Sequence, residues 1–184
     1  MNTHIAELRV IEAAEFAAEK HRSQRRKDEH ATPYINHPLR VAYSLAIAGE
    51  SDTELLMAAL LHDTIEDTDT TYEELRHKFG AEVADLVLEL TDDKRLDKDE
   101  RKRRQVLHAG SKSIRARKLK LADKVDNVRD IILHPPKGWS EQRKKEYVLF
   151  SREVVQQIRG CQPVLENEFD ELCRRFEDSF GPIH

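Results

Sequence analysis

The run Leu55-Leu56-Met57-Ala58-Ala59-Leu60-Leu61 is the longest uninterrupted apolar stretch of the sequence. It is apolar on every side, which predicts a short helix buried at the centre of the fold. Ser51 and Glu54 precede it with the spacing of a capping box, which favours a helix start just before the run. Its seven residues are far fewer than the roughly 20 that cross a bilayer, so we expect no membrane-spanning segment.

Apolar residues recur at helical spacing on both sides of this run. The predicted helices cover residues 3–21, 39–48, the apolar run, Thr70 to Gly80, 83–90, a long segment that ends at 134–136, Ser140 to Gly160, and a last segment through Leu165 to Phe176. Residues 22–38 predict a shaped loop, and the charged stretch 92–104 predicts a solvated helix or loop. We therefore expect one all-α domain of about eight to ten helices over residues 1–184, with the C-terminal helices from about residue 161 packed onto it.

Composition narrows the class of protein. The chain has 184 residues with only six glycines and six prolines, a scarcity that argues against turn-rich β folds. No two glycines have the spacing of a Gly-rich phosphate loop. Two cysteines and the lack of an export signal predict a reduced, cytoplasmic protein. The net charge of −4 gives no support to nucleic acid as a partner.

One imidazole and four carboxylates crowd the end of the predicted buried helix. They are His62, Asp63, Glu66, Asp67 and Asp69. Carboxylates at a helix C-terminus oppose the helix dipole, and Asp63 and Asp67 repel each other at a spacing of four residues. A bound cation would relieve both costs, whereas a helix that simply ends in water would leave the acids solvated. The spacing alone leaves both alternatives open.

Two distant residues, His37 and Asp123, are further candidates for a metal site. His37 follows a Pro-Tyr-Ile-Asn segment that fixes the backbone, and Asp123 shares a helix face with Asn127 and Asp130 beside an apolar stripe. Each of these residues alone is more often a satisfied polar group than a ligand. Together with His62-Asp63, His37 and Asp123 offer two nitrogens and two oxygens. That set suits manganese, iron or zinc better than calcium and favours a hydrolytic centre.

The same residues resemble a known signature. His37, His62-Asp63 and Asp123 match the H…HD…D pattern of HD-domain metal phosphohydrolases, a superfamily of helical bundles. The narrower resemblance is to the alarmone hydrolase domain of the RelA/SpoT family, and it is carried by His21-Arg22, Gln24 to Asp28, Thr32 to Pro38, Ala59 to Thr68, Thr91 to Lys94, and Lys120 to Lys124. Positions that match the family pattern run from residue 21 to about residue 147, and the sequence has only 184 residues. We therefore expect a stand-alone small alarmone hydrolase, similar to the metazoan SpoT homologues, with no synthetase or regulatory domain.

The resemblance implies a manganese ion held by His37, His62, Asp63 and Asp123. It also implies hydrolysis of the 3′-diphosphate of ppGpp or pppGpp to GDP or GTP and pyrophosphate, with Glu66 and Asp67 orienting or deprotonating the attacking water. The implied substrate contacts are Arg26 and Lys27 beside the base and phosphates, Asn127 at the nucleoside, and Lys98, Arg143 and Tyr147 near the phosphate tail. Cationic side chains fit a polyphosphate substrate, but Lys98 and Arg143 fit exposed surface charges equally well.

Other functions remain compatible with the sequence. The same metal centre could act on ppApp, or could remove a single phosphate from NADPH. A non-catalytic nucleotide-sensing HD domain is a different class, against which the complete ligand set and the Glu66-Asp67 pair argue. A helical scaffold with an acidic corner would bind no transition metal. Ala31, where glycine is frequent in the family, and Asp126 depart from the family pattern and leave the purine preference open. The sequence predicts no oligomeric state.

Overall fold

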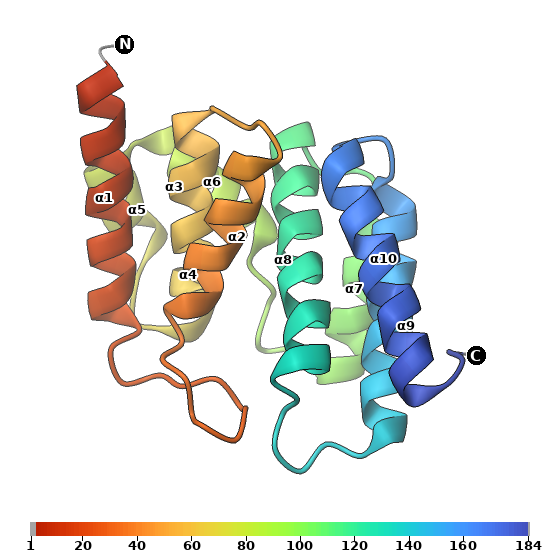
Figure 1. The fold of residues 1–184 in the computed structure, drawn as a ribbon. Coiled ribbons are helices and arrows are strands. Elements are labelled where there is room, and N and C mark those ends of the chain that lie inside the picture. Colours follow the sequence, from red (N-terminus) through yellow and green to blue (C-terminus); the bar gives the residue numbers. More distant parts are fainter. Residues whose placement is uncertain (1–2, 184) are drawn as a thin grey trace. The chain divides into compact units, whose positions relative to one another are not determined.

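The computed structural model describes residues 3–183, and every regular element in this range is an α-helix (Figure 1). The all-α prediction is therefore confirmed, and the number of helices lies at the upper end of the expected range. The helices are α1 (Thr3–Lys20), α2 (Asn36–Ile47), α3 (Thr53–Leu61), α4 (Thr64–Asp67), α5 (Tyr72–Phe79), α6 (Ala81–Leu90), α7 (Lys98–Ala109), α8 (Ile114–Leu133), α9 (Glu141–Ile158) and α10 (Pro163–Phe180).

The chain divides into two compact units. The first unit contains residues 1–24 and 33–95, and the second contains residues 25–32 and 96–184. The loop 25–32 thus belongs with the C-terminal half of the chain, although it lies between α1 and α2 in sequence. The expectation of a single domain over residues 1–184 stays a prediction, and its end residues 1, 2 and 184 lie outside the described range.

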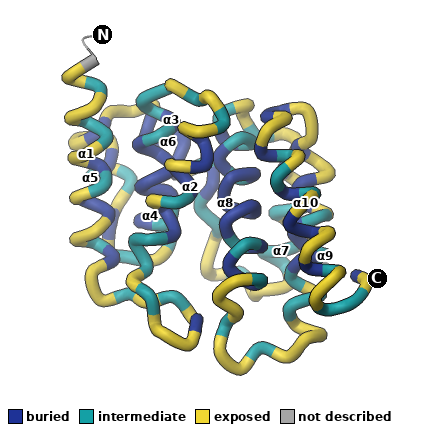
Figure 2. Tube along the Cα trace, in the orientation of Figure 1, coloured by how far each residue is buried: buried dark blue, intermediate teal, exposed yellow. Residues whose placement is uncertain are grey.

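In the first unit, α3 is the central helix and packs against α1, α2 and α6. The apolar run explains this position because Leu55, Met57 and Leu61 are fully buried, and Figure 2 shows most of α3 in the colour of buried residues. The helix begins one residue later than the capping box predicts. Asp52 is the N-cap, and its side chain accepts a hydrogen bond from the backbone N–H of Leu55.

In the second unit, α8 packs mainly against α10 and also against α9, which in turn packs against α7. Its apolar side chains Leu121, Val125 and Val128 are buried, as are the α10 side chains Phe169 and Phe176. The same helix also buries four charged side chains, Asp123, Lys124, Asp126 and Asp130. Burying a charge is costly unless it is paired, so these four residues require local partners.

The remaining helix boundaries follow local capping. The start of α5 is capped by Thr71, one residue after the predicted Thr70, and Gly80 ends it with a φ of 94° that favours glycine. The charged stretch 92–104 divides into a loop and the first part of α7, which Asp97 caps by accepting from the backbone N–H groups of Asp99 and Glu100. Within residues 3–183, no helix combines the length and apolarity needed to cross a membrane.

Candidate metal centre

The acidic cluster of the first unit lies beyond the buried helix rather than on it. The prediction put these acids at the helix C-terminus, but α3 ends at Leu61 and a short helix, α4, begins at Thr64. At this break the hydroxyl of the buried Thr64 donates to the Leu61 carbonyl oxygen at 2.7 Å. His62 and Asp63 therefore lie at the junction between two helices, while Glu66 lies in the separate turn.

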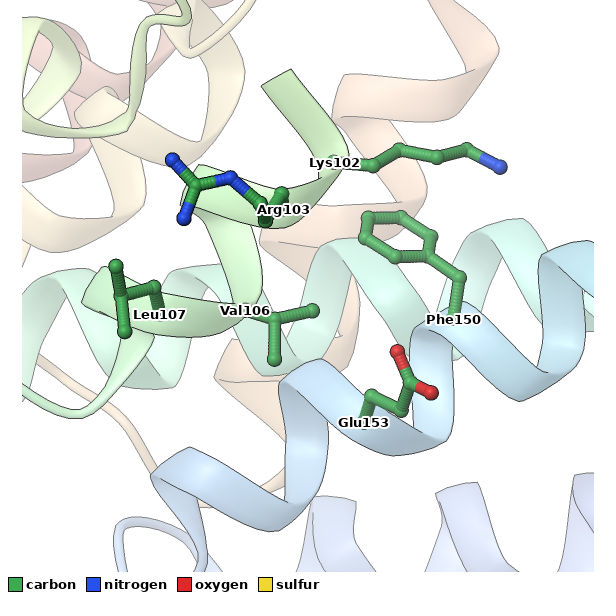
Figure 3. Close-up of a pocket in the computed structure, with 6 residues that line it drawn as sticks. All are labelled: Lys102, Arg103, Val106, Leu107, Phe150 and Glu153. Carbon is green, nitrogen blue, oxygen red and sulfur yellow. The ribbon is translucent and has the colours of Figure 1, made fainter. Parts of the chain in front are cut away.

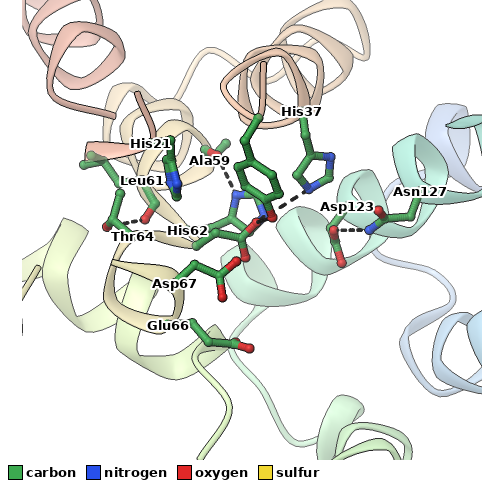
Figure 4. A network of polar contacts seen from close by, with 12 residues as sticks. His21, His37, Ala59, Leu61, His62, Thr64, Glu66, Asp67, Asp123 and Asn127 are labelled. Atoms are coloured by element: carbon green, nitrogen blue, oxygen red, sulfur yellow. Dashed lines mark hydrogen bonds and ion pairs between the residues drawn. The ribbon is translucent and has the colours of Figure 1, made fainter. Parts of the chain in front are cut away.

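His37, His62 and Asp63 come together in the first unit. The His37 and His62 rings lie edge to face, with centroids 5.2 Å apart (Figure 4), and each ring offers a nitrogen within 4.8 Å of the other's. Asp63 Oδ2 lies 3.1 Å from His62 Nε2 and 3.7 Å from His37 Nε2. His62 Nδ1 donates to the Ala59 carbonyl oxygen at 2.8 Å, which directs Nε2 toward the carboxylate. Both histidines are buried.

This donor set fits a divalent transition metal. Two imidazole nitrogens and a carboxylate oxygen are ligands that manganese, iron and zinc accept, and three protein ligands are typical of a catalytic site that keeps open positions. Tyr34 orients the carboxylate, because its hydroxyl donates to Asp63 Oδ2 at 2.5 Å. A backbone carbonyl thus orients one imidazole, and a phenol orients the carboxylate.

Glu66 and Asp67 lie in different environments. Burial raises the pKa of the Glu66 carboxyl, although this group also accepts a hydrogen bond from the Asp92 backbone N–H at 3.2 Å. Asp67 instead accepts from Gln24 Nε2 at 3.0 Å and pairs with Lys94 Nζ at 2.5 Å. A carboxyl whose pKa burial raises suits proton transfer, whereas a carboxylate held by a cation and an amide suits orientation.

A buried histidine supports the Asp67 side of this cluster. His21 Nδ1 lies 2.6 Å from Gln24 Oε1, and the ring packs against Tyr34 with centroids 4.9 Å apart. Because Gln24 donates to Asp67 through Nε2, its Oε1 must accept, so the His21 proton lies on Nδ1. Burial lowers the His21 pKa, which favours this neutral form. The amide of Gln24 is therefore fixed from both ends.

Asp123, the remaining predicted ligand, lies on α8 in the second unit and is buried. Its Oδ1 accepts from Asn127 Nδ2 at 2.6 Å (Figure 4). Asn127 Oδ1 in turn accepts from Arg26 Nη2 at 3.2 Å, and Arg26 also donates to Asp130 Oδ2 from Nε at 3.0 Å and from Nη2 at 2.7 Å. The predicted substrate residues Arg26 and Asn127 thus form one network with Asp123.

Other predicted substrate residues gather around aromatic rings of the second unit. The Arg143 guanidinium lies 4.4 Å from the Trp139 ring centre, and the Trp139 and Tyr147 centroids are 5.8 Å apart. Lys124 Nζ lies 5.8 Å from the Tyr147 ring and 3.5 Å from Asp123 Oδ2. The buried Lys124 therefore links the aromatic group to the carboxylate.

The last two predicted substrate residues, Lys27 and Lys98, are exposed. Lys98 is the first residue of α7, and the Lys27 carbonyl oxygen accepts from the Lys137 backbone N–H at 2.6 Å. The latter bond ties the loop 25–32 to the segment after α8. Ala31 in this loop has a φ of 49°, the left-handed conformation that explains why glycine suits the position. Asp126 is buried and pairs with Arg129 at 3.3 Å, which in turn contacts Glu168 of α10.

A pocket of about 440 Å³ in the second unit contains none of the predicted site residues. Lys102, Arg103, Val106 and Leu107 of α7 and Phe150 and Glu153 of α9 line it (Figure 3). Its mixed apolar and charged lining offers no metal-binding set.

Sequence reasoning assigned no role to Tyr34, Gln24, His21 or Lys94. All four belong to segments that carry the family resemblance, and this resemblance was the feature of the sequence that could have pointed to them. Their contacts reach Asp63 or Asp67, 27 to 43 residues away in sequence for the direct hydrogen bonds, so no local periodicity could have revealed them.

Comparison with known proteins gives consistent matches. A family model described as an HD domain matches residues 13–151. The chain is 54% identical to guanosine-3′,5′-bis(diphosphate) 3′-pyrophosphohydrolase MESH1 of Xenopus tropicalis over 89% of this chain and 92% of the relative. It is 51% identical to the human protein of that name over 95% and 97% of the two chains. A solved structure, described as a metazoan ortholog of SpoT that hydrolyses ppGpp, is 46% identical, covers 91% of this chain and 94% of its own, and has a TM-score of 0.88.

Proposed function

We propose a function from the premise that this chain belongs to the HD domain family: it is a metal-dependent pyrophosphohydrolase of ppGpp and pppGpp. The enzyme adds water across the bond between the 3′-oxygen and its diphosphate, which yields GDP or GTP and pyrophosphate. The similarity to metazoan ppGpp hydrolases over most of both chains supports this substrate. The observation that carries the proposal is the convergence of His37, His62 and Asp63 on one point of the first unit.

We infer that His37, His62, Asp63 and Asp123 hold the metal ion and that this ion is manganese. The mixed nitrogen and oxygen donors support a transition metal of this kind. When bound, such an ion polarises a phosphoryl oxygen and activates water for hydrolysis. Asp123 is included because the family pattern assigns it and because it is a buried carboxylate that is already oriented by Asn127.

Glu66 accepts the proton of the attacking water in this proposal, and Asp67 orients that water. The raised pKa of Glu66 matches the first role, because a base works best when its pKa lies closer to the working pH. The double anchoring of Asp67 by Gln24 and Lys94 matches the second role.

The second unit binds the nucleotide in this proposal. Arg143 and Tyr147 lie with Trp139 in a group that offers a cation and aromatic surfaces, and Lys27 and Lys98 add exposed ammonium groups for phosphates. Arg26 and Asn127 contact the base and nucleoside. A small nucleotide substrate and a net charge of −4 support a cytoplasmic enzyme without a nucleic-acid partner.

The test is to incubate the purified chain with Mn²⁺ and ppGpp, ppApp or NADPH, and to measure pyrophosphate and orthophosphate separately. The proposal expects pyrophosphate and GDP from ppGpp. Pyrophosphate only from ppApp, or orthophosphate only from NADPH, would move the function to the corresponding alternative substrate. Nucleotide binding without any product would identify a sensing domain instead.

A further inference from the structure

A chain of three side chains leads from the loop 25–32 to Asp123 within the second unit. Asp123, Asn127 and Asp130 are spaced four and three residues apart, so they share one face of α8. Arg26 reaches this face from the loop and donates to both Asn127 and Asp130. The loop itself is closed by Asp28, whose carboxylate accepts from the backbone and the hydroxyl of Thr32.

The ion pair between Arg26 and Asp130 holds the guanidinium at this position. The two side chains are only 15% and 10% exposed, so little water competes for their hydrogen bonds. Two guanidinium nitrogens donate to the same Asp130 oxygen, which fixes the plane of the group as well as its location. Arg26 is therefore a rigid donor for its next neighbour, Asn127.

The arginine determines which way the Asn127 amide points. A guanidinium has only donors, so the amide must turn its oxygen toward Arg26 and its nitrogen toward Asp123. The reverse orientation would place two donors against each other at Arg26 and two acceptors against each other at Asp123. Asp123 Oδ1 is thereby committed to Asn127 at 2.6 Å, and the carboxylate plane is fixed.

We propose that Arg26 and Asn127 are positioning residues that orient the Asp123 carboxylate for metal binding. This inference rests on the proposed metal site, and it gives both residues a role that does not need the nucleotide. Hydrogen bonds that orient a ligand typically contribute about 10- to 100-fold to metal affinity. The contribution of Asn127 should therefore be visible in the binding of the metal alone.

The experiment titrates Mn²⁺ into the metal-free full-length chain by calorimetry, without nucleotide. Asn127→Ala should weaken the Mn²⁺ Kd about 10- to 100-fold. Arg26→Lys should also weaken it, because lysine loses the planar guanidinium, but by less, because lysine keeps the positive charge. Asn167→Ala and Arg159→Lys are matched controls in the same unit. Asn167 is exposed on α10, and Arg159 pairs with Asp170 at the surface. Neither control should change the Kd.

A second readout separates orientation of the metal ligand from substrate contact and from a folding defect. If Asn127 acts through Asp123, the Mn²⁺ Kd of Asn127→Ala is weakened without nucleotide present, while the thermal unfolding of the metal-free variant stays near the wild-type value. A Kd unchanged in both Asn127→Ala and Arg26→Lys, with only the nucleotide KM raised, would overturn the inference and leave the proposed function standing. Failure of the wild-type chain itself to bind Mn²⁺ would overturn both.

Discussion

The two units contribute unlike halves to the proposed centre. The first unit offers two imidazoles and a carboxylate, with Glu66 and the anchored Asp67 close by in sequence on α4. The second unit offers one carboxylate, Asp123, flanked by Lys124 and held through an amide by an arginine. Under the proposed function the two units have different tasks: the first supplies three of the four metal ligands and the residues that act on water, and the second supplies Asp123 and the cationic groups for phosphate.

We expect the largest effect when the two carboxylates proposed to act on the attacking water are substituted and the metal ligands are kept. Glu66→Gln combined with Asp67→Asn should lower kcat by about 10²- to 10⁴-fold, because proton transfer contributes about that much. The Mn²⁺ Kd should change little. Steady-state kinetics and calorimetry measure the two quantities on the same preparation.

The single variants sharpen this prediction. Glu66→Gln should account for most of the loss, since Asp67 is already paired with Lys94. Asp69→Asn is the matched control, because Asp69 is exposed and its partner is Lys20. Normal turnover by the double variant would show that these carboxylates do not activate the water.

A smaller effect tests how the first unit orients its carboxylate ligand. Tyr34→Phe removes the hydroxyl that donates to Asp63 Oδ2 and should weaken the Mn²⁺ Kd by about 10-fold, near the lower end of the range for such hydrogen bonds. Tyr43→Phe on the exposed face of α2 should have no effect. If Tyr34→Phe binds Mn²⁺ as tightly as the wild type, orientation by hydrogen bonds matters only in the second unit.

The smallest effect concerns stability and pH. Burial raises the folded-state pKa of Glu66 above its ordinary value of 4.5, so the folded state binds its proton more tightly than the unfolded state does. The associated stability is fully present below pH 4.5 and is lost as the pH rises through the folded-state pKa. Metal-free Glu66→Gln should therefore have a higher Tm than the metal-free wild type at pH 7.

Scanning calorimetry at several pH values, with a chelator present, measures this difference. It should shrink as the pH falls below 4.5, because the wild-type carboxyl then becomes protonated in both states. Glu82→Gln, at an exposed position of α6, should show no comparable difference. A lower Tm for Glu66→Gln at pH 7 would mean that the charged carboxylate is well accommodated in the fold.

The sequence predicted the helices better than it predicted their exact starts. The buried α3 follows from an apolar run that no surface position would tolerate. Its N-cap was wrong by one residue because Ser51 and Asp52 are adjacent acceptors, and Thr70 and Thr71 pose the same ambiguity before α5. The break between α3 and α4 at residues 62 and 63 falls between helical turns, and hydrophobic periodicity does not detect it.

For the candidate site, the sequence likewise predicted which residues come together better than it predicted the contacts that hold them. The grouping of His37 with His62-Asp63 was predicted from their ligand types and from motif resemblance, and the first unit brings these residues together. The environment of Arg26 was not predictable, because its partner Asp130 lies 104 residues further along the chain. A basic residue in a loop suggests a phosphate contact, and only the fold reveals that its charge is already paired.

The most direct test of the central claim is the Mn²⁺ affinity of three full-length chains: the wild type, His62→Ala and Asp123→Ala. Calorimetry and elemental analysis should find one ion per wild-type chain, and each substitution should weaken binding by more than the about 10- to 100-fold that an orienting hydrogen bond contributes, because a direct bond to the ion is lost. Binding by Asp123→Ala as tight as that of the wild type would contradict the claim, since the ion would then belong to the first unit alone.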